Sequence, residues 1–323
     1  MVPERARIDR FSGDLDALAP AGARLGIALS GGADSLALLL LAAAARRSMV
    51  EAATVDHALR PDSRDEAQAA GAMCKALAVP HTILTAEWRE RPASAIQERA
   101  RAERYRLLAG WAEKQGLDAI LTGHHADDQA ETLLMRLNRG AGVHGLGGMR
   151  ASSTVPGADV RLLRPLLGWR RSELERVCSE AGVTPLMDPS NADDRFERVR
   201  IRRALAEADC TDPAAIAASA AHLASADEAL DWAADRLWQR SVSEKDGQLT
   251  YAPGDAPAEL VRRIVARAVT TLASEGIGQP LRARELDPLL QTLASGGQAT
   301  LRGVLCAGGT RWRFSPAPHR SSR

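Results

Sequence analysis

The sequence predicts an α/β protein in which a doubly wound parallel sheet precedes a smaller, mainly helical C-terminal domain. Short apolar runs alternate with helical patterns over roughly the first 200 residues, which is typical of parallel strands connected by helices. A loop of serine and glycine joins the first apolar run to its helix, and doubly wound sheets bind ligands at such ends of strands. Near Asp209 this alternation gives way to an alanine-rich helical pattern.

The expected elements follow one another in a regular order. The predicted strands are RLGIAL, EAATVDH, HTILTA, LDAILTGHH and DVRLLRPLL, at residues 24–29, 51–57, 81–86, 117–125 and 159–167. The predicted helices span residues 36–45, 64–77, 94–115, 126–137 and 170–181. RGAGVHGLGGMR, residues 139–150, has five glycines and is expected to be a loop, either mobile or pressed against a ligand.

The C-terminal third has a different character. We expect a boundary near Asp209, giving domains at residues 1–209 and 210–323. Asp212 and Pro213 have the pattern of a helix start. Helices are predicted at residues 214–240, 258–273 and 284–293, and GGQATLRGVLCAGGTRWRFSP, residues 296–316, predicts a short terminal strand or hairpin.

The amino-acid composition excludes few classes of binding partner. The 42 basic and 41 acidic residues give a formal net charge of +1, so any nucleic-acid footprint must come from local clusters. The four cysteines, Cys74, Cys178, Cys210 and Cys306, are far apart and suggest no zinc site. The charged N-terminus and the lack of an apolar run of about 20 residues favour a cytoplasmic protein.

The loop SGGADS has the features of an anion site. It lies between a predicted strand and helix, where backbone N–H groups and the helix N-terminus converge. It lacks the GK[ST] ending of a Walker A loop and the GxGxxG spacing. A carboxylate beside a phosphate points to an intervening Mg²⁺, although helix capping is an alternative for the aspartate. The candidate ATP-binding residues are Ser30, Gly31, Gly32, Ala33, Asp34 and Ser35.

A second acidic group follows the strand LDAILTGHH. HHADDQAET places Asp127, Asp128 and Glu131 within about one helical turn, and Asp127 and Glu131 share a face at i, i+4. Like charges this close are unfavourable unless a cation, such as Mg²⁺ or a substrate ammonium, joins them. An acidic first turn favoured by the helix dipole is the structural alternative. The adjacent His124 and His125 are more readily interpreted as phosphate or nucleotide contacts than as catalysts.

Arginine-rich segments supply local positive charge. RLLRPLLGWRRSELER and RFERVRIRR concentrate arginines as RNA phosphate contacts require, although such runs are often only solvated helix faces. The candidate tRNA-binding residues are Arg195, Arg198, Arg200, Arg202 and Arg203. Arg101 and Arg104 share a helix face with Tyr105 nearby, and the bidentate arginine fork suits phosphate.

These motifs resemble a known family. SGGADS resembles the pyrophosphate loop of the N-type ATP pyrophosphatases, which transfer AMP to a carbonyl oxygen. Four further blocks resemble the tRNA(Ile)-lysidine synthetase family: VDHALRPDSRDEA, RAERYRLL, TGHHADDQAETLLMRLNRGAGVHGLGGM and DPSNADDRFERVRIRR, beginning at residues 55, 101, 122 and 188. The last block departs from the family pattern, because Val199 stands where an asparagine is usual.

The resemblance implies an adenine nucleotide alpha hydrolase-like fold and a specific reaction. ATP would adenylate the wobble cytidine of the isoleucine tRNA with a CAU anticodon, and L-lysine would then displace AMP at C2, giving lysidine. The implied requirements are ATP, Mg²⁺, L-lysine and that tRNA. Asp34 and Asp127 are expected to position Mg²⁺ and ATP, and Asp128 and Glu131 to hold lysine. Arg104 is expected to contact ATP phosphates or tRNA, and the loop Gly140 to Gly148 to close over the site.

Two alternatives remain open. A tRNA cytidine thiolase would keep the fold, but that branch normally has clustered cysteines, which this chain lacks. A regulatory nucleotide-binding module without turnover would need neither the acidic cluster nor the arginine-rich segments.

Overall fold

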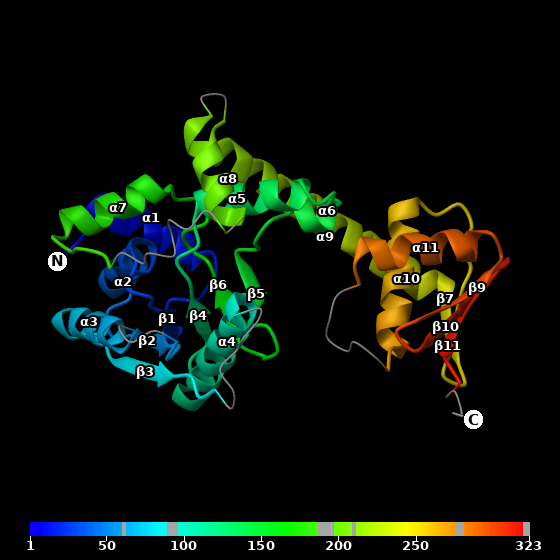
Figure 1. Cartoon of the computed structure of the whole chain (residues 1–323), viewed down its shortest axis with the longest axis horizontal. Coiled ribbons are helices and arrows are strands. Elements are labelled where there is room, and N and C mark those ends of the chain that lie inside the picture. Colours follow the sequence, from blue (N-terminus) through cyan, green and yellow to red (C-terminus); the bar gives the residue numbers. More distant parts are fainter. Residues whose placement is uncertain are drawn as a thin grey trace. The chain divides into compact units, whose positions relative to one another are not determined.

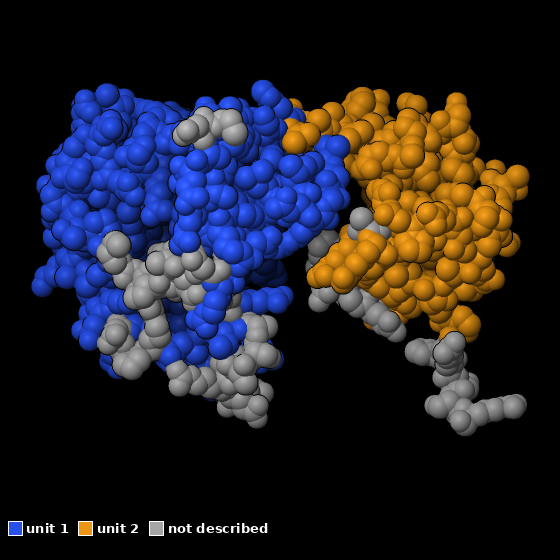
Figure 2. All heavy atoms as spheres, turned by 45° about the horizontal axis from the view of Figure 1, so that its top comes forward, with its two compact units in different colours: residues 1–222 blue, residues 223–323 orange. Residues whose placement is uncertain are grey.

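The chain forms two compact units, Met1–His222 and Leu223–Arg323, coloured separately in Figure 2. The computed structural model, shown as a ribbon in Figure 1, describes residues 1–59, 63–88, 96–186, 195, 197–208, 211–274 and 281–318. The boundary expected near Asp209 lies outside these residues. Helix α9 (Pro213–Ser241) runs through the change from the first unit to the second.

Unit 1 is built on a six-stranded sheet among the described residues, with strand order β3-β2-β1-β4-β6-β5. The strands are β1 (Leu25–Ala28), β2 (Val50–Asp56), β3 (His81–Thr85), β4 (Ala119–Leu121), β5 (Ser152–Thr154) and β6 (Arg161–Leu163). All neighbours pair in parallel except β5, which is antiparallel to β6. The predicted parallel α/β fold is therefore confirmed, and β5 is an edge strand that the sequence pattern did not indicate.

Helices cover both faces of this sheet (Figure 1). The helices of unit 1 before α9, in the described residues, are α1 (Arg5–Asp16), α2 (Ala33–Ala45), α3 (Ser63–Ala76), α4 (Ile96–Gln115), α5 (Ala126–Leu137), α6 (Val143–Leu146), α7 (Arg171–Glu180) and α8 (Glu197–Glu207). Of these, α6 and α8 pack on α5. Leu25 and Ile27 of β1 belong to the core shared with α1, α2 and α7, whereas Ala28 belongs to the core on the α4 side. This alternation follows from the two-residue repeat of a strand.

The packing of helix α2 explains why its sequence is apolar on all sides. It lies against α1 and α7 as well as the sheet, and Leu36 to Leu41 are all buried. A helix with no solvent face has no use for a polar stripe. On the opposite face, Gly26 of β1 lets Trp111 of α4 approach, because a Cβ at this position would lie 2.6 Å from the indole ring. The first strand is thereby fixed between two layers.

The strand order places a topological switch beside β1. The chain leaves β1 for β2 on one side, and β4 pairs with β1 on the other. Connections that run in opposite directions leave a crevice at the carboxyl ends of the two strands. The loop 29–32 and the residues that follow Leu121 meet at this crevice.

Unit 2 combines helices with a five-stranded antiparallel sheet among its described residues, in the order β7-β8-β11-β10-β9. Its elements besides α9 are β7 (Val242–Lys245), β8 (Gln248–Tyr251), α10 (Ala258–Leu272), α11 (Ala283–Ala294), β9 (Gln298–Leu301), β10 (Val304–Ala307) and β11 (Trp312–Pro316). Ile264 and Val265 of α10 pack with Phe314 of β11 in its core. The helices were predicted, but the sheet is larger than the expected terminal strand or hairpin.

The helices of the described ranges include none with the length and apolar character needed to cross a bilayer.

Candidate active site at the carboxyl edge of the parallel sheet

The SGGADS loop is held in shape by its own serines. Ser35 Oγ accepts a hydrogen bond from the Ser30 backbone N–H at 3.1 Å and donates to the Gly32 carbonyl at 3.0 Å. Gly31 has φ +83°, and a Cβ there would lie 2.6 Å from Leu186 Cδ1. Glycine is therefore required both for the backbone conformation and for the close contact with Leu186.

The loop leaves the start of α2 open for an anion. Gly32 is the N-cap of α2, and no side chain caps the helix. Asp34 lies in the first turn of α2 but makes no capping hydrogen bond, so side-chain capping does not account for this residue. A helix N-terminus without a capping side chain attracts phosphate.

β4 approaches this loop closely. A Cβ at Gly123 would lie 2.8 Å from the Asp34 carbonyl oxygen, so only glycine lets the end of β4 meet the loop. We did not predict Gly123 or Leu186 as site residues. The signal for Gly123 was present, since it is the residue between the predicted strand and the paired histidines.

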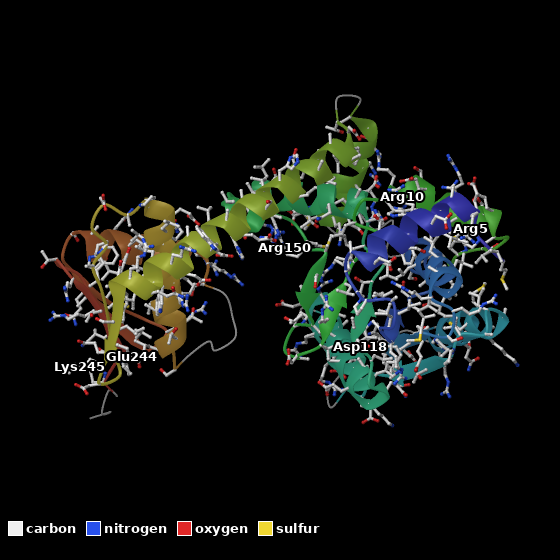
Figure 3. The ribbon with its side chains drawn as sticks, turned by 180° about the vertical axis from the view of Figure 1, so that it is seen from behind. Arg5, Arg10, Asp118, Arg150, Glu244 and Lys245 are labelled. Carbon is white, nitrogen blue, oxygen red and sulfur yellow. The ribbon has the colours of Figure 1, made fainter. Side chains whose placement is uncertain are left out.

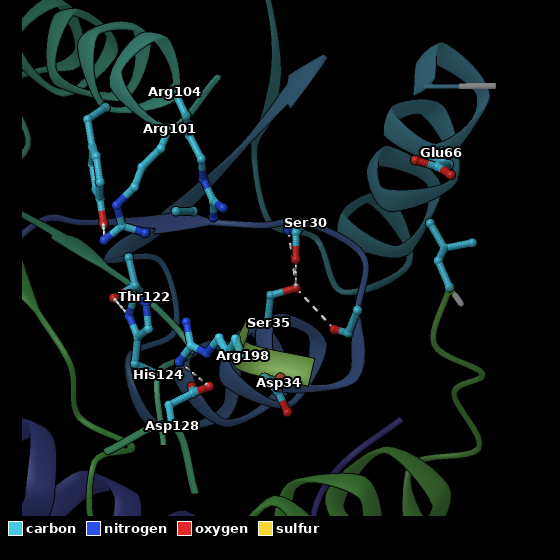
Figure 4. Close-up of a pocket in the computed structure, with 15 residues that line it drawn as sticks. Ser30, Asp34, Ser35, Glu66, Arg101, Arg104, Thr122, His124, Asp128 and Arg198 are labelled. Carbon is cyan, nitrogen blue, oxygen red and sulfur yellow. Dashed lines mark hydrogen bonds and ion pairs between the residues drawn. The ribbon is translucent and has the colours of Figure 1, made fainter. Parts of the chain in front are cut away.

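A cavity of about 390 Å³ opens over the loop (Figure 4). Its lining side chains come from the loop, α3, α4, the end of β4, α5 and α8, together with Leu186. They include Ser30, Asp34, Ser35, Glu66, Arg101, Arg104, Tyr105, Thr122, His124, Asp128 and Arg198. The structure thus brings the loop, the acidic group, the paired α4 arginines and one arginine of RFERVRIRR to one place.

The α4 side of the cavity is cationic. Arg101 donates to Tyr105 Oη at 3.2 Å, and Arg104 lies one helical turn further along α4. Neither arginine has a carboxylate within ion-pair distance among the described residues, and burial lowers the pKa of Arg104. In Figure 4 the Arg104 side chain points toward Ser30, and the Arg101 side chain points toward Thr122. Uncompensated guanidinium groups beside a phosphate loop suit a polyphosphate.

His124 contributes no charge to this side. Its Nδ1 lies 2.9 Å from Thr122 Oγ1. Burial, together with nearby arginines including Arg164, Arg101 and Arg104, lowers the pKa of His124 to about 3. The imidazole is therefore neutral at pH 7 and offers one hydrogen-bond donor and one acceptor.

The α5 side of the cavity is acidic and is organised around His125. This residue is 2% exposed, and its ring nitrogens lie 3.5 Å from Asp34 Oδ1, 3.6 Å from Asp127 Oδ2 and 3.5 Å from Asp128 Oδ2. Burial opposes the charged ring, but the nearby carboxylates of Asp127, Asp34 and Asp128 raise the pKa of His125 to about 10. The ring thus lies among three carboxylates, and its Nδ1 also accepts from the Asp128 backbone N–H at 3.4 Å, as the N-cap of α5. Asp34 Oδ1 is buried without a hydrogen-bond partner among the described residues.

Asp127 points away from the cavity. It accepts from the Arg171 backbone N–H at 2.8 Å and from the Arg170 guanidinium at 3.2 and 3.3 Å. Burial opposes ionisation, but the hydrogen bonds from His125, Arg171 and Arg170 hold the pKa of Asp127 well below its usual range. Asp127 is not among the residues that line the cavity.

Glu131 and Asp128 are joined by arginines of α8. Glu131 is 1% exposed and accepts from Arg198 Nε and Arg202 Nε, both at 2.6 Å. Arg198 also donates to Asp128 Oδ1 at 2.9 Å. The expected i, i+4 partnership of Asp127 with Glu131 is therefore replaced by an i, i+3 pair, Asp128 and Glu131, that shares Arg198. The cation that neutralises them comes from the chain itself.

The five candidate tRNA-binding arginines divide into two groups. Arg198 and Arg202 face α5 through the contacts above. Arg195, Arg200 and Arg203 are exposed, and Arg200 donates to the Arg195 carbonyl at 3.2 Å. Val199, which stands where the family usually has an asparagine, is half-buried. The described contacts show no other side chain that supplies the hydrogen bonds of that asparagine.

The glycine-rich segment is ordered rather than open. Val143–Leu146 forms one turn of helix, so the expectation of a plain loop was incomplete. Arg136 donates to the Gly145 and Gly148 carbonyls. The Gln129 side-chain amide donates to the Met149 carbonyl and accepts from the Met149 backbone N–H. No residue from 139 to 149 lines the cavity.

Among the described residues no group of three or more histidine, cysteine, aspartate or glutamate side chains has the geometry of a metal site. Cys74 and Cys178 are buried in unit 1, and burial raises the pKa of each thiol, to about 12 and about 11. None of the three described cysteines lines the cavity.

Comparisons with known proteins agree with this geometry. A family profile described as a PP-loop domain matches residues 5–209. The chain is 49% identical to the tRNA(Ile)-lysidine synthase of Novosphingobium aromaticivorans, over 97% of this chain and 95% of that protein. It is 40% identical to the tRNA(Ile)-lysidine synthase of Zymomonas mobilis, over 93% and 91% of the two chains.

A solved structure shares the fold. The U34-tRNA thiolase NcsA of Methanococcus maripaludis superposes with a TM-score of 0.58 at 16% identity, covering 69% of this chain and 81% of that one. At this identity the likeness concerns the fold alone. Taken with the family profile and the near full-length relatives, it leads to one assignment: the chain belongs to the tRNA(Ile)-lysidine synthase family, the ligases built on a PP-loop domain.

Proposed function

We propose that this protein uses ATP to join L-lysine to C2 of the wobble cytidine in the isoleucine tRNA with a CAU anticodon, giving lysidine, AMP and pyrophosphate. One observation carries the proposal beyond family membership. A single cavity holds an open helix N-terminus, two arginines without carboxylate partners among the described residues, and three carboxylates, Asp34, Glu66 and Asp128. This set provides for the two charged substrates, a triphosphate and an ammonium group.

The first step is adenylation of the base. The cytidine O2 attacks the α-phosphorus of ATP, a new P–O bond forms, and pyrophosphate leaves with the electrons of the broken P–O bond. The N–H groups at the start of α2 and the side chains of Ser30, Arg101 and Arg104 would hold the departing charge. Preorganised donors of this kind stabilise charge as it develops.

Mg²⁺ fits one side of the cavity. Asp34 Oδ1 is a buried oxygen without a hydrogen-bond partner, and magnesium is commonly bound through one or two carboxylates plus substrate phosphates. We assign Asp34 as the protein ligand. Asp127 would support it indirectly, by holding His125, because its own oxygens already accept from Arg170 and Arg171. Bound there, the metal would neutralise charge on the triphosphate.

The second step brings in lysine. The ε-amine arrives protonated, with an ordinary pKa of about 10.4, and must lose that proton before attack. We propose Asp128 as its partner and proton acceptor, because Asp128 lines the cavity and burial, aided by Glu131, raises the pKa of this carboxyl. The amine nitrogen then bonds to C2, and AMP leaves with the O2 oxygen. Glu131 would act indirectly, by holding the side chains of Arg198 and Arg202 in place.

The tRNA would contact both units. Arg195, Arg200 and Arg203 are exposed on or beside α8, whose Arg198 lines the cavity. Phosphate contacts from these residues would deliver a single-stranded anticodon loop, whose bases can be splayed out, to the active site. The C-terminal domain would add further tRNA contacts. Such a substrate implies a cytoplasmic enzyme.

The two alternatives are less well supported. A thiolase with a cysteine-bound cluster would need cysteines at the cavity, and the described part of the chain supplies none there. A module without turnover gives no reason for the buried carboxylates Asp128 and Glu131 beside a phosphate loop.

Lysidine formation tests the proposal directly. The protein is incubated with ATP, labelled lysine and a transcript of the CAU isoleucine tRNA, and the digested RNA is analysed by mass spectrometry. We expect lysidine, and AMP and pyrophosphate in equal amounts, only when all three substrates are present. A transcript with uridine at the wobble position is the matched control. Folded protein that yields no modified nucleoside would rule the proposal out.

A further inference from the structure

Arg170 lies at a junction of helices beside the active site and is not among the residues that line its cavity. It is the N-cap of α7, and its backbone N–H donates to Glu173 Oε2 at 2.8 Å. The Trp169 carbonyl accepts from the Ala126 backbone N–H at 2.8 Å, so the start of α5 is bonded to the residue before Arg170. The first turns of α5 and α7 therefore meet at this point of the chain.

Helix α1 holds the same segment. Arg10, labelled in Figure 3, donates to the Gly168 carbonyl at 2.8 Å and to Glu173 Oε1 at 2.7 Å. The Arg10 guanidinium also lies 4.2 Å from the ring centroid of Trp169, which is buried. The backbone that carries Arg170 is thus fixed on both sides of this residue, so its side chain has a rigid base.

The Arg170 guanidinium makes a two-point contact with Asp127. Its Nε lies 3.3 Å from Asp127 Oδ2, and its Nη2 lies 3.2 Å from Asp127 Oδ1. The planar fork of arginine matches a carboxylate in this way and sets the rotation of the carboxylate as well as its position. The remaining nitrogen, Nη1, lies 3.3 Å from Oδ1 of Asp212, the residue before α9.

Asp127 in turn lies against the His125 ring. Asp127 Oδ2 is 3.6 Å from His125 Nδ1, and His125 Nε2 is 3.5 Å from Asp34 Oδ1. The buried ring therefore lies between a carboxylate outside the cavity, Asp127, and a carboxylate that lines it, Asp34. Because the ring contacts both, a shift of Asp127 would move the ring relative to Asp34.

Stability alone does not account for the contact between Arg170 and Asp127. The two side chains are 36% and 22% exposed, and ion pairs with such access to water contribute little to the free energy of unfolding. Asp127 Oδ2 also accepts from the Arg171 backbone N–H at 2.8 Å, a hydrogen bond that does not depend on the Arg170 side chain. What the guanidinium adds is the second point of contact, which sets the rotation of the carboxylate.

We propose that Arg170 is a positioning residue for the ATP and metal site: through Asp127 and His125 it holds Asp34 in the orientation that binds the metal ion. The assignment of Asp34 as the metal ligand rests on the proposed function. Removal of such an outer partner typically lowers metal affinity or activity 10- to 100-fold. Substitution of Arg170 should therefore lower kcat and the affinity for a metal–nucleotide complex, and leave KM for tRNA unchanged.

The first measurement needs neither lysine nor tRNA. Electron paramagnetic resonance follows binding of a Mn²⁺ complex to the full-length protein, the nucleotide being an ATP analogue with a methylene group between the α and β phosphorus atoms. We expect Arg170→Gln to weaken binding about tenfold, and Arg170→Lys, which keeps the charge but not the fork, to weaken it less.

Two control variants should bind the Mn²⁺ complex as the wild type does. Arg176→Gln removes an exposed arginine of the same helix, α7. Asp212→Asn removes the charge of the other partner of Arg170 and keeps a side-chain acceptor for the Ala214 backbone N–H at the start of α9.

The second measurement is the kinetics of lysidine formation. Arg170→Gln should lower kcat about 10- to 100-fold with KM for tRNA unchanged. Combining it with Asp127→Asn should add nothing to the larger single effect, because both substitutions act through one contact. Additive effects, or an Arg170→Gln protein that matches Arg176→Gln in both measurements, would overturn the proposal.

The two measurements together separate this proposal from the proposed function. If the wild type makes no lysidine but Arg170→Gln still weakens binding of the Mn²⁺ complex, only the proposed function fails. Circular dichroism checks folding, and if Arg170→Gln does not fold, Arg170→Lys is compared with Arg176→Gln in the same way. An Arg170→Lys protein indistinguishable from that control would then overturn the proposal.

Discussion

The two sides of the active-site cavity differ in how their charges are balanced. On the α5 side, Asp127, Asp128 and Glu131 each have an arginine partner within the chain. On the α4 side, Arg101 and Arg104 have no carboxylate partner among the described residues. The acidic side is therefore largely neutralised by the fold itself, and Asp34, beside the His125 ring, is the carboxylate there that has no arginine partner among the described residues. The cationic side gains its counter-charge only when an anionic ligand binds. Substitutions can test this difference.

The largest effect is expected for Asp34→Ala. If Asp34 is the carboxylate that the fold leaves for a ligand, its loss should reduce kcat by about a thousandfold or more, or about 4 kcal/mol, while the protein stays folded. The measurement is the initial rate of lysidine formation, with circular dichroism to check folding. Asp34→Asn keeps the shape and serves as the matched variant. Activity within tenfold of wild type in both variants would remove Asp34 from the metal site.

Glu131→Ala should chiefly affect stability. It leaves Arg198 and Arg202 without their buried carboxylate, and breaking such a pair from one side costs about 2–4 kcal/mol, less than in a fully buried case because both arginines are about one-third exposed. Urea unfolding measures the loss. Glu131→Gln, which keeps the hydrogen-bond acceptor, should lose less. A Glu131→Ala protein as stable as wild type would show that the α5–α8 pairs do not hold α8 in place.

Arg104→Gln should affect ATP binding rather than stability. No internal partner is lost, so the free energy of unfolding should change by less than about 0.5 kcal/mol or rise slightly, whereas KM for ATP should increase about 10- to 100-fold. Steady-state kinetics at varied ATP, together with thermal melts, provide both numbers. Arg106→Gln is the control, since Arg106 is an exposed arginine of the same helix that pairs with Glu103. An unchanged KM would exclude Arg104 from the ATP site.

The smallest effect is a pH dependence from His124. Its folded-state pKa, lowered to about 3, lies below the unfolded value of about 6.5, so the unfolded chain binds the extra proton between these values. The stability that comes from the neutral ring is present above pH 6.5 and is lost as pH falls, by about 1.4 kcal/mol per pH unit. Urea unfolding of wild type and His124→Gln between pH 7.5 and 5 should show the wild type losing more. If the free energy of unfolding depends on pH in the same way in both proteins, the His124 ring is not buried beside the arginines.

Much of the fold could be predicted because it depends on local pattern. The parallel strands and their helices follow from apolar periodicity, and the SGGADS loop follows from glycine and serine at a strand–helix junction. The β7–β8 hairpin was also predictable, since Asp246 and Gly247 form the turn with φ of 52° and 72°, as Asp-Gly turns do, yet we did not predict it. The antiparallel edge strand β5 had no such signal.

The orientation of neighbouring acidic residues was not predictable. Asp127 and Asp128 are adjacent in the first turn of α5, so their side chains point about 100° apart. Asp127 meets Arg170 at the start of α7, and Asp128 meets the cavity and Arg198. The sequence shows two carboxylates, but which one faces the ligand depends on where α7 and α8 pack.

The sequence by itself determined the fold class, the phosphate loop and the family, because these reside in residue types at fixed short spacings. Only the tertiary structure decided which charges remain available for a ligand. It paired Glu131 with Arg198 and Arg202 across 67 and 71 residues of chain, and it left Arg101 and Arg104 without carboxylate partners in the described structure. Ion pairing acts over a few ångströms in space, and spacing along the chain does not record it.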